Sequence, residues 1–359
     1  MQISRLRAQN LRKIRALEIT PSPNLNLIWG ANGSGKTTLL EALHLLNSAK
    51  SFRSSGFKDL VTHQEHQFGV SGQLLGSKDG LRAIRIQKME KSTRIELDGQ
   101  AVTSAATLAQ TFPLLLVDPH SFGIVEGGPR IRRSLIDRAV FHVEPDFISA
   151  ARSYLNGLAQ RNALLKTRQR SAQLDYWNNE VASSGERVHL ARQRCVEFIN
   201  ASLAEEKTLA GVLGRISLKY RQGWREGSSL LEALERQGPT EWQAGQTLSG
   251  PHKAELIIQG EGETLARFAS RGQIKSVVFL LMTTLCDYIK SCRAIQPILM
   301  VDDFGAELDE LMLGLTLKMV RETGAQAFLT TIHSHLARNV STSSDALFHV
   351  ERGEVTPVS

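Results

Sequence analysis

One short stretch of the chain has the residue types and spacing to bind a nucleotide. The sequence GANGSGKTT matches the pattern G-x-x-x-x-G-K-[ST]. Its glycines permit backbone angles that turn successive N–H groups inward, and a helix that starts here adds its unpaired N-terminal donors and its dipole. Such a loop is typical of proteins that hold a nucleoside triphosphate. The residues expected to contact the nucleotide are Gly30, Ala31, Asn32, Gly33, Ser34, Gly35, Lys36, Thr37 and Thr38.

The segments on either side of this loop match what a phosphate-binding loop requires. The apolar run 25–29 predicts a buried strand, and the apolar residues of 39–47 have helical spacing. In that context Lys36 would neutralise charge on the β- and γ-phosphates, and the Thr37 hydroxyl would bind magnesium. A chance glycine-rich turn is the alternative, and the strand–loop–helix order argues against it.

A second segment, PILMVDDFGAELDE, supplies carboxylates for the same chemistry. Residues 297–301 form an apolar run typical of a buried strand, which ends at Asp302 and Asp303. Asp302 would assist magnesium binding, and Asp303 would polarise a water for attack on the γ-phosphate. Two aspartates after a strand are often only a turn, so the catalytic interpretation depends on the loop that begins at Gly30.

The distance along the chain between these segments limits the class of protein. From Lys36 to Asp302 is 302 − 36 = 266 positions. Small GTPases and nucleotide kinases usually place their second acidic strand much nearer the loop, and the sequence contains no N-K-x-D guanine-binding motif. Most of the chain is therefore expected to lie between two halves of one site.

A third element, SRGQ, opens a long apolar segment that predicts a helix. Ser270 lies where a helix cap presents a hydroxyl and free N–H groups to an anion, although a plain N-cap serine is common. The order of phosphate loop, S-R-G-Q helix start and acidic strand is that of ABC-type ATPase heads. In that class the serine helix of one subunit contacts the γ-phosphate bound by the other, so Ser270 is expected to act in trans within an ATP-dependent homodimer.

Taken together, these motifs resemble the RecF family, within the ABC-type ATPases that also include Rad50 and SMC heads. The resemblance extends along nearly the whole chain, and the G-P-x-x-R-R-x-x-x-D and S-G-P-H-K/R segments are its most specific parts. The matching segments are LRAQNLRKIR at 6–15, GANGSGKTTLLEA at 30–42, SFR at 51–53, GGPRIRRSLIDRAV at 127–140, LSGPHKAEL at 248–256, SRGQIKS at 270–276 and VDDFGAELD at 301–309.

The resemblance implies an α/β fold: an ABC-type P-loop ATPase head with a mixed β-sheet and helices, plus an inserted, mostly helical lobe. It implies ATP and Mg²⁺ as cofactors, slow ATP turnover, and an ATP-bound dimer that binds duplex DNA, gapped DNA or single-strand/duplex junctions. Such proteins act with RecR and RecO to help RecA replace single-strand-binding protein, in DNA repair, replication restart and SOS induction. By the same resemblance, Arg12 and Arg53 are expected to help hold the nucleotide.

Three positions depart from the ABC-type pattern. The usual S-x-L-D dimer loop reads AELD at 306–309, so a serine contact across the dimer is missing. Thr331 stands where many ABC heads have a histidine that senses the γ-phosphate; His333 could substitute, or could be a solvated loop histidine. No Q-loop glutamine is evident near 117–121. Weak hydrolysis is consistent with these departures.

Between residues 122 and 242 the hydrophobic pattern becomes helical, which predicts an inserted lobe in a head formed by residues 1–121 and 243–359. Rad50 and SMC proteins insert hundreds of coiled-coil residues at this point, so the short insert weighs against a chromosome-organising complex. Residues 130–170 contain nine Lys plus Arg against three acids. They are either a solvated helix face or a surface that contacts DNA phosphates without reading sequence.

The composition permits a polyanionic partner such as nucleic acid but does not require one. The net charge of the 359 residues is +7, and the three cysteines lack metal-site spacing and favour a reducing cytoplasm. We find no signal-peptide pattern and no apolar run long enough to span a membrane. A transporter's ATPase subunit is the other class weighed, but it would place the acidic strand nearer the loop and leave the basic insert without a role.

Overall fold

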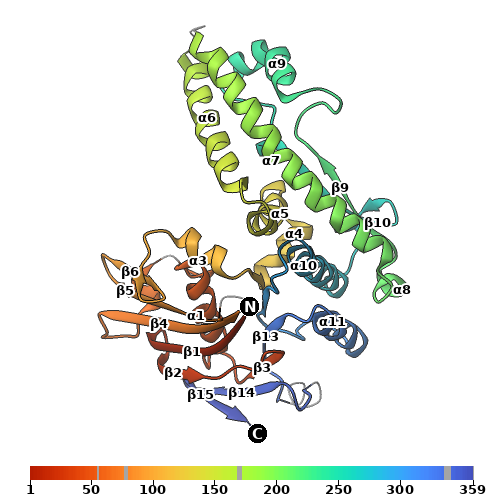
Figure 1. Cartoon of the computed structure of the whole chain (residues 1–359). Helices are drawn as coiled ribbons and strands as arrows, with labels where there is room; N and C mark the ends of the chain where they lie inside the picture. The colour runs from red at the N-terminus through yellow and green to blue at the C-terminus, as the bar shows by residue number, and fades with distance from the viewer. Residues whose placement is uncertain (55, 77–79, 168–171, 335–340, 359) are drawn as a thin grey trace. The chain divides into compact units, whose positions relative to one another are not determined.

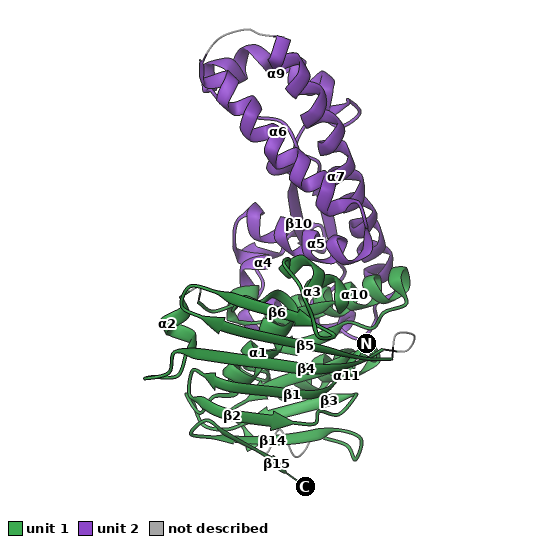
Figure 2. Cartoon of the chain, turned by 60° about the vertical axis from the view of Figure 1, so that its left-hand side comes forward, with its two compact units in different colours: residues 1–121, 275–359 green, residues 122–274 purple. Residues whose placement is uncertain are grey.

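The computed structural model describes residues 1–54, 56–76, 80–167, 172–334 and 341–358. The chain forms two compact units, which Figure 2 shows in different colours. Unit 1 contains residues 1–121 and 275–359, and unit 2 contains residues 122–274. No helix within the described ranges is both long and apolar enough to cross a membrane.

The central sheet of unit 1 contains the strands that precede the loop at Gly30 and the aspartates at 302 and 303. Its strand order is β15-β14-β3-β13-β12-β8, parallel throughout except for the β14–β15 pair. The strands β12 and β13 are buried along their whole length, as expected for parallel strands with both faces covered. The bounds are β3 Leu25–Trp29, β8 Leu114–Val117, β12 Ile298–Val301, β13 Gln326–Thr331, β14 Ala346–Glu351 and β15 Glu354–Val358.

A second, antiparallel sheet has the order β2-β1-β4-β5-β6-β7. Buried residues alternate with partly buried ones along β4 and with exposed ones at the centre of β5, as expected when one face packs on the core and the other meets solvent. The buried face packs against helix α1, Lys36–Ser48; a side chain at Gly72 would collide with Leu46 of this helix. The strands are β1 Gln2–Leu11, β2 Ile14–Ile19, β4 Gln67–Gly76, β5 Gly80–Met89, β6 Thr93–Leu97 and β7 Gln100–Ala101.

Helix α1 is buried along most of its length; only Thr37, His44 and Ser48 are partly exposed. Its leucines, among them Leu39, Leu43 and Leu46, belong to one core cluster with residues of both sheets, such as Leu6 and Phe328. The remaining helices of unit 1 are α2 Phe57–Leu60, α3 Ala105–Thr111 and α11 Glu310–Glu322; η1 Pro119–Phe122 and α10 Arg271–Arg293 extend across the division between the units.

Unit 2 is mostly helical, with α6 and α7 side by side as its longest helices (Figure 1). Glycines permit their close approach: a side chain at Gly157 of α6 would press on Val181 of α7. A small antiparallel sheet has the order β11-β10-β9. The elements are α4 Gly123–Glu126, α5 Pro129–Val143, α6 Phe147–Thr167, α7 Ala172–Glu205, α8 Ala210–Leu213, β9 Ile216–Arg221, α9 Leu230–Ala244, η2 Pro251–Lys253, β10 Glu255–Gly260, β11 Glu263–Thr264 and η3 Leu265–Arg267.

The predicted lobe and unit 2 begin at the same residue, Phe122, but unit 2 runs on to Ile274. The physical reason is strand pairing: β10 pairs with β9 along its whole length, so a division at 242/243 would separate hydrogen-bonded strands. The division of the chain into 1–121 plus 243–359 and 122–242 stays a prediction.

Candidate nucleotide-binding site

The phosphate loop connects β3 to α1, and each of its glycines has its own structural reason. Gly33 and Gly35 adopt positive φ angles of 73° and 123°, which other residues rarely adopt. Gly30 has no room for a side chain, since a Cβ there would lie 2.2 Å from the Val350 carbonyl oxygen. Gly35 is also the N-cap of α1 and provides no side-chain cap, so the first-turn N–H groups remain suited to bind an anion.

Lys36 lies inside the loop with 8% of its surface exposed. Its ammonium Nζ donates to the carbonyl oxygens of Gly30 and Ala31, at 2.8 and 2.9 Å. Burial lowers the pKa of Lys36, and the negative charges of Asp302 and Asp303 act in the opposite direction. The loop therefore surrounds a cation at the place where phosphate oxygens are expected.

Asp302 brings the acidic strand to this loop. Its Oδ1 accepts hydrogen bonds from the Thr37 hydroxyl at 3.0 Å and the Thr330 hydroxyl at 2.7 Å. Burial raises the pKa of Asp302, although these hydroxyls and the positive charge of Arg53 partly oppose the effect. A carboxylate beside a threonine hydroxyl is an oxygen donor set that Mg²⁺ prefers, because magnesium in such sites takes few protein ligands and completes its shell with phosphates and water.

Asp303 has an unusual backbone. Its φ angle is +60°, a left-handed conformation that is uncommon outside glycine but that aspartate adopts more often than most residues. Its N–H donates to the Thr330 hydroxyl at 2.9 Å, and its carbonyl oxygen accepts from Lys275 Nζ at 3.1 Å. The next residue, Phe304, is fully buried and packs edge-on against Phe279 of α10. The backbone that carries the Asp303 carboxylate is thus held on several sides.

The two arginines expected to hold nucleotide have different surroundings. Arg12 is engaged within the fold: its guanidinium forms an ion pair with the buried Glu41 and donates to the Ser54 hydroxyl and the Asp59 carbonyl. The hydrogen bond to Glu41 is the main reason why the pKa of Arg12 is raised. Arg53 is exposed and close enough to Asp302 to lower its pKa. A role in nucleotide binding stays a prediction for both arginines.

Ser270 belongs to unit 2, whereas the other predicted site residues belong to unit 1. It forms a reciprocal cap at the start of α10: Gln273 N–H donates to the Ser270 hydroxyl oxygen at 3.3 Å, and Ser270 N–H donates to Gln273 Oε1 at 2.9 Å. The plain N-cap role weighed from the sequence is therefore present. The hydroxyl hydrogen does not take part in either bond, so it can still donate to an anion.

The three sequence departures have simple local structures. Thr331 is fully buried and its hydroxyl oxygen accepts from His333 N–H, whereas the His333 side chain is exposed. Asp309 ends the AELD segment as the N-cap of α11, accepting from Met312 N–H at 2.8 Å. Near 117–121, Ser121 closes a turn on Asp118. A γ-phosphate sensor and a Q-loop residue stay unassigned.

Two residues that contact the site were not identified from the sequence, Thr330 and Lys275. Thr330 lies at the end of β13, the parallel neighbour of β12, so the shared sheet edge was the available indication. Lys275 is the only charged residue in the apolar stretch 274–286 and is 3% exposed. A buried lysine in such a run indicates a specific partner.

The basic stretch 130–170 divides into internal and exposed residues. Arg161 is 1% exposed and forms an ion pair with Glu241 at 2.6 Å, and Arg132 pairs with Glu255 at 2.9 Å. Arg133 donates to the Ala254 carbonyl at 2.7 Å. These three arginines stabilise unit 2, so the charge count overstated the surface available to DNA. Arg130, Arg138, Arg152 and Lys166 are exposed, and residues 168 and 170 lie outside the described ranges.

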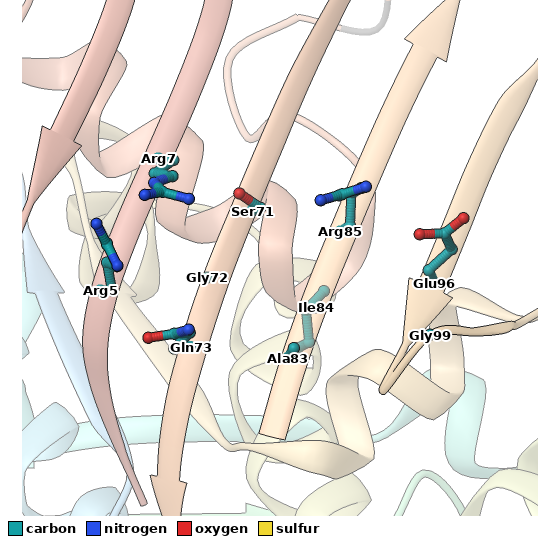
Figure 3. A pocket seen from close by; sticks show the side chains of 10 residues that line it. All are labelled: Arg5, Arg7, Ser71, Gly72, Gln73, Ala83, Ile84, Arg85, Glu96 and Gly99. Atoms are coloured by element: carbon teal, nitrogen blue, oxygen red, sulfur yellow. The ribbon is translucent and has the colours of Figure 1, made fainter. Parts of the chain in front are cut away.

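A second arginine-rich surface lies on the open face of the antiparallel sheet in unit 1, where a hollow of about 270 Å³ is found. Figure 3 shows the side chains that line it, among them Arg5 and Arg7 on β1, Ser71 on β4 and Arg85 on β5. Arg5 and Arg7 both pair with Glu18 of β2. Among the residues that the structure describes, Arg85 takes part in no ion pair on this face. This surface was not evident from the sequence, because its arginines are far apart in the chain.

Comparisons of sequence identify relatives along the full length of the chain. A family model described as RecF/RecN/SMC N terminal domain matches residues 2–356. A DNA replication and repair protein RecF of Vibrio parahaemolyticus serotype O3:K6 is 35% identical over 99% of both chains. The protein of the same name in Pseudomonas aeruginosa (strain LESB58) is 34% identical over 99% of this chain and 98% of the relative. That of Shewanella sp. (strain MR-7) is 33% identical over both full lengths.

Solved structures show the same fold. A structure of the recombination mediator protein RecF-ATP in the RecFOR pathway has a TM-score of 0.85 at 21% identity, covering 100% of this chain and 98% of that chain. A SmcHead crystal structure, bound to the C-winged helix domain of ScpA, has a TM-score of 0.61 at 16% identity over 100% of this chain and 98% of that chain. The fold class expected from the sequence, an α/β head with an inserted, mostly helical lobe, is confirmed.

Proposed function

The chain belongs to the RecF family, and on this premise we propose that it is an ATP-dependent, DNA-binding recombination mediator. In this proposal the protein dimerises on ATP, binds duplex or gapped DNA and helps to load a recombinase at single-strand gaps. The observation that carries the nucleotide site is the hydrogen bond between Thr37 and Asp302, which joins the phosphate loop to the acidic strand.

Within this site the chain's own residues have distinct roles. The loop N–H groups and Lys36 bind the β- and γ-phosphates of ATP. Thr37 and Asp302 would hold Mg²⁺, and the bound ion would supply positive charge next to the phosphate oxygens. Asp303 orients and polarises the attacking water, and slow hydrolysis acts as a switch that ends the ATP-bound state.

We assign Ser270 a role in trans, on the nucleotide held by a second copy. Its reciprocal cap with Gln273 supports this role, because the hydroxyl oxygen is fixed by Gln273 N–H while its hydrogen stays available to a phosphate. The N-terminal end of α10 adds favourable electrostatics for an anion. ATP would then bridge two subunits, and ADP, which lacks the γ-phosphate, would not.

DNA binding in this proposal relies on contacts with phosphates, since arginines dominate both candidate surfaces. The sheet face around Arg7 and Arg85 offers one surface, and exposed residues of unit 2, such as Arg130 and Arg152, offer another. Contacts of this kind are largely independent of sequence and weaken with salt. Partnership with RecR and RecO is proposed from the RecFOR pathway named for the structurally similar protein.

Dimerisation tests the proposal directly. We would measure molar mass by light scattering with ATP, with ADP and without nucleotide, and expect a dimer with ATP alone. A molar mass that does not depend on nucleotide would refute the switch. Ser270→Ala should abolish the ATP-dependent dimer. Ser229→Ala is a matched control, because Ser229 forms the same reciprocal cap with Glu232 at the start of α9.

Binding to duplex, single-stranded and gapped DNA, measured with the same three nucleotide states, tests the second half of the proposal. We expect ATP to strengthen binding to duplex and gapped DNA above binding to single strands, because phosphate contacts rather than base stacking dominate the candidate surfaces. Equal binding with ATP and ADP would separate DNA binding from the nucleotide and contradict the mediator mechanism.

A further inference from the structure

The loop that follows β12 has two residues in the left-handed region of the backbone. Asp303 and Glu307 adopt φ angles of +60° and +61°; aspartate adopts this region more often than most residues, whereas glutamate rarely does. Such conformations persist where the surrounding structure holds them, and they are frequent at functional sites. The contacts that hold this loop therefore bear on where the Asp303 carboxylate points.

Thr330 of β13 holds the loop on one side. Its hydroxyl accepts from Asp303 N–H at 2.9 Å and donates to Asp302 Oδ1 at 2.7 Å, while its carbonyl accepts from Phe304 N–H at 2.7 Å. These contacts fix the N–H groups of residues 303 and 304. They leave the carbonyl oxygens of the loop to another partner.

Lys275 of α10 is that partner. Its ammonium donates to the carbonyl oxygen of Asp303 at 3.1 Å and to that of Ala306 at 2.6 Å. Asp303 and Ala306 are also the two ends of a turn, since Ala306 N–H donates to the Asp303 carbonyl at 3.4 Å. One ammonium group thus closes both ends of the turn that begins at Asp303.

An ammonium in this position needs a structural reason. Lys275 is 3% exposed among apolar residues of α10, and burial of a charge is unfavourable unless hydrogen bonds and opposite charge compensate it. Burial lowers the pKa of Lys275, and the carboxylates of Asp303 and Glu307 oppose that shift. A methionine of similar length would fill the same space without the cost of burying a charge, so the contacts with the loop are what the lysine adds.

We infer that Lys275 is a positioning residue for ATP hydrolysis: together with Thr330 it holds the Asp303 backbone in the conformation that directs its carboxylate toward the attacking water. The inference rests on the proposed function, in which Asp303 polarises that water. Lys275 donates to the carbonyls of Asp303 and Ala306, in the loop after β12 and not in the phosphate loop, so its removal is expected to affect turnover more than nucleotide binding.

The experiment compares Lys275→Met with wild type in the full chain. We expect kcat for ATP to fall about 10- to 100-fold, because small displacements of a catalytic group have effects of this size. The ATP dissociation constant, measured without turnover, should change by less than about twofold, since the variant removes no ground-state contact with nucleotide. Lys275→Arg should restore much of kcat, because its guanidinium can donate to the same two carbonyls.

Lys290→Met is the matched control on the same helix. Lys290 Nζ also donates to a backbone carbonyl, that of Thr323, at 3.2 Å, but far along α10 from the loop. Its loss should leave kcat unchanged. Should Lys275→Met not fold, Lys275→Gln replaces it, and its neutral amide is expected to lower kcat less than methionine would.

Three outcomes are distinguishable. A wild-type kcat in Lys275→Met, or in Lys275→Gln if methionine does not fold, overturns the inference. A loss of ATP affinity equal to the loss of kcat also overturns it, because it indicates a general disturbance of the site. A wild-type protein that binds ATP but never hydrolyses it refutes the hydrolytic part of the proposed function instead.

Discussion

Thr37 and Asp302 lie 265 positions apart in the chain, and the Thr37 hydroxyl donates to Asp302 Oδ1 at 3.0 Å. This contact places the end of the phosphate loop against the end of the acidic strand. It exists because β3 and β12 are both parallel to β13, so their carboxyl ends share one edge of the sheet.

Removal of the lysine in the phosphate loop should weaken nucleotide binding. Lys36→Ala is expected to lower ATP affinity by about 10- to 100-fold, the range for loss of charge-assisted hydrogen bonds. Lys13→Ala is the control, because Lys13 Nζ also donates to the loop, at the Gly33 carbonyl, but from an exposed position. Calorimetric titration with ATP measures both variants, and equal affinities for them would contradict the role assigned to Lys36.

Neutralising the expected catalytic carboxylate should separate binding from hydrolysis. Asp303→Asn is expected to bind ATP as wild type does. Its rate of ATP hydrolysis should fall by at least about 100-fold, the usual effect of losing a group that transfers a proton. The ATP-bound dimer should consequently last longer. Phosphate release and light scattering measure the two effects, and normal hydrolysis by this variant would show that Asp303 is not the base.

The pKa of Asp302 gives stability a definite pH dependence. Burial raises the pKa of Asp302 in the folded protein, so ionisation of this carboxyl disfavours folding. The loss of stability is absent when the pH lies below the pKa of Asp302 in the unfolded chain, and it is complete when the pH lies above the raised pKa in the folded protein. Asp302→Asn should therefore raise the melting temperature of the nucleotide-free protein at neutral pH, and the gain should vanish as the pH falls below about 4. Added Mg²⁺ should no longer change the melting temperature of this variant.

Asp345→Asn provides a control of opposite sign. Despite burial, hydrogen bonds from Arg321 and Thr342 lower the pKa of Asp345, so its carboxylate stabilises the fold above the unfolded pKa. Its replacement should lower the melting temperature at neutral pH, with the loss shrinking as the pH falls through the lowered pKa. If the melting temperatures of Asp302→Asn and Asp345→Asn shift in the same direction at neutral pH, this account of Asp302 is refuted.

The sheet face of unit 1 should contribute to DNA binding. Arg85→Ala is expected to weaken binding to duplexes of any sequence and to reduce the salt dependence of log K by about one unit, as for one lost phosphate contact. Arg82→Ala is the control from the same strand, because Arg82 pairs with Asp98 at 2.9 Å. Fluorescence anisotropy titrations at several salt concentrations measure this effect. If the slope of log K against log salt concentration is the same for wild type and Arg85→Ala, this face of the sheet does not contact DNA.

Arg161 should matter for stability and not for DNA. It donates to Asn178 and Thr247 and pairs with Glu241, and both partners of the ion pair are essentially unexposed. Arg161→Met is expected to destabilise the fold by about 3–5 kcal/mol, because it leaves a buried carboxylate unpaired. Chemical denaturation measures this loss, and replacing Glu241 by Leu as well should recover part of it. If Arg161→Met has the stability of wild type, the ion pair between Arg161 and Glu241 does not stabilise the fold.

The sequence by itself determined the local chemistry. The glycines of the phosphate loop, the cap at Ser270 and the strands that precede Gly30 and Asp302 follow from short patterns whose physical causes are local: backbone freedom, helix capping and continuous apolar runs. The helical character of the insert follows from its periodicity in the same way. None of these inferences required knowledge of which segments meet.

Only the tertiary structure decided which groups share a site and which charged side chains are paired in the interior of the fold. Thr330 and Lys275 contact the loop after β12 because a parallel sheet and a helix bring distant segments together, and no local pattern encodes such a meeting. Arg161 looked like a surface charge within a basic run but is buried against Glu241. Arg7 and Arg85 looked unrelated but line one hollow, because the strand register aligns them across β4.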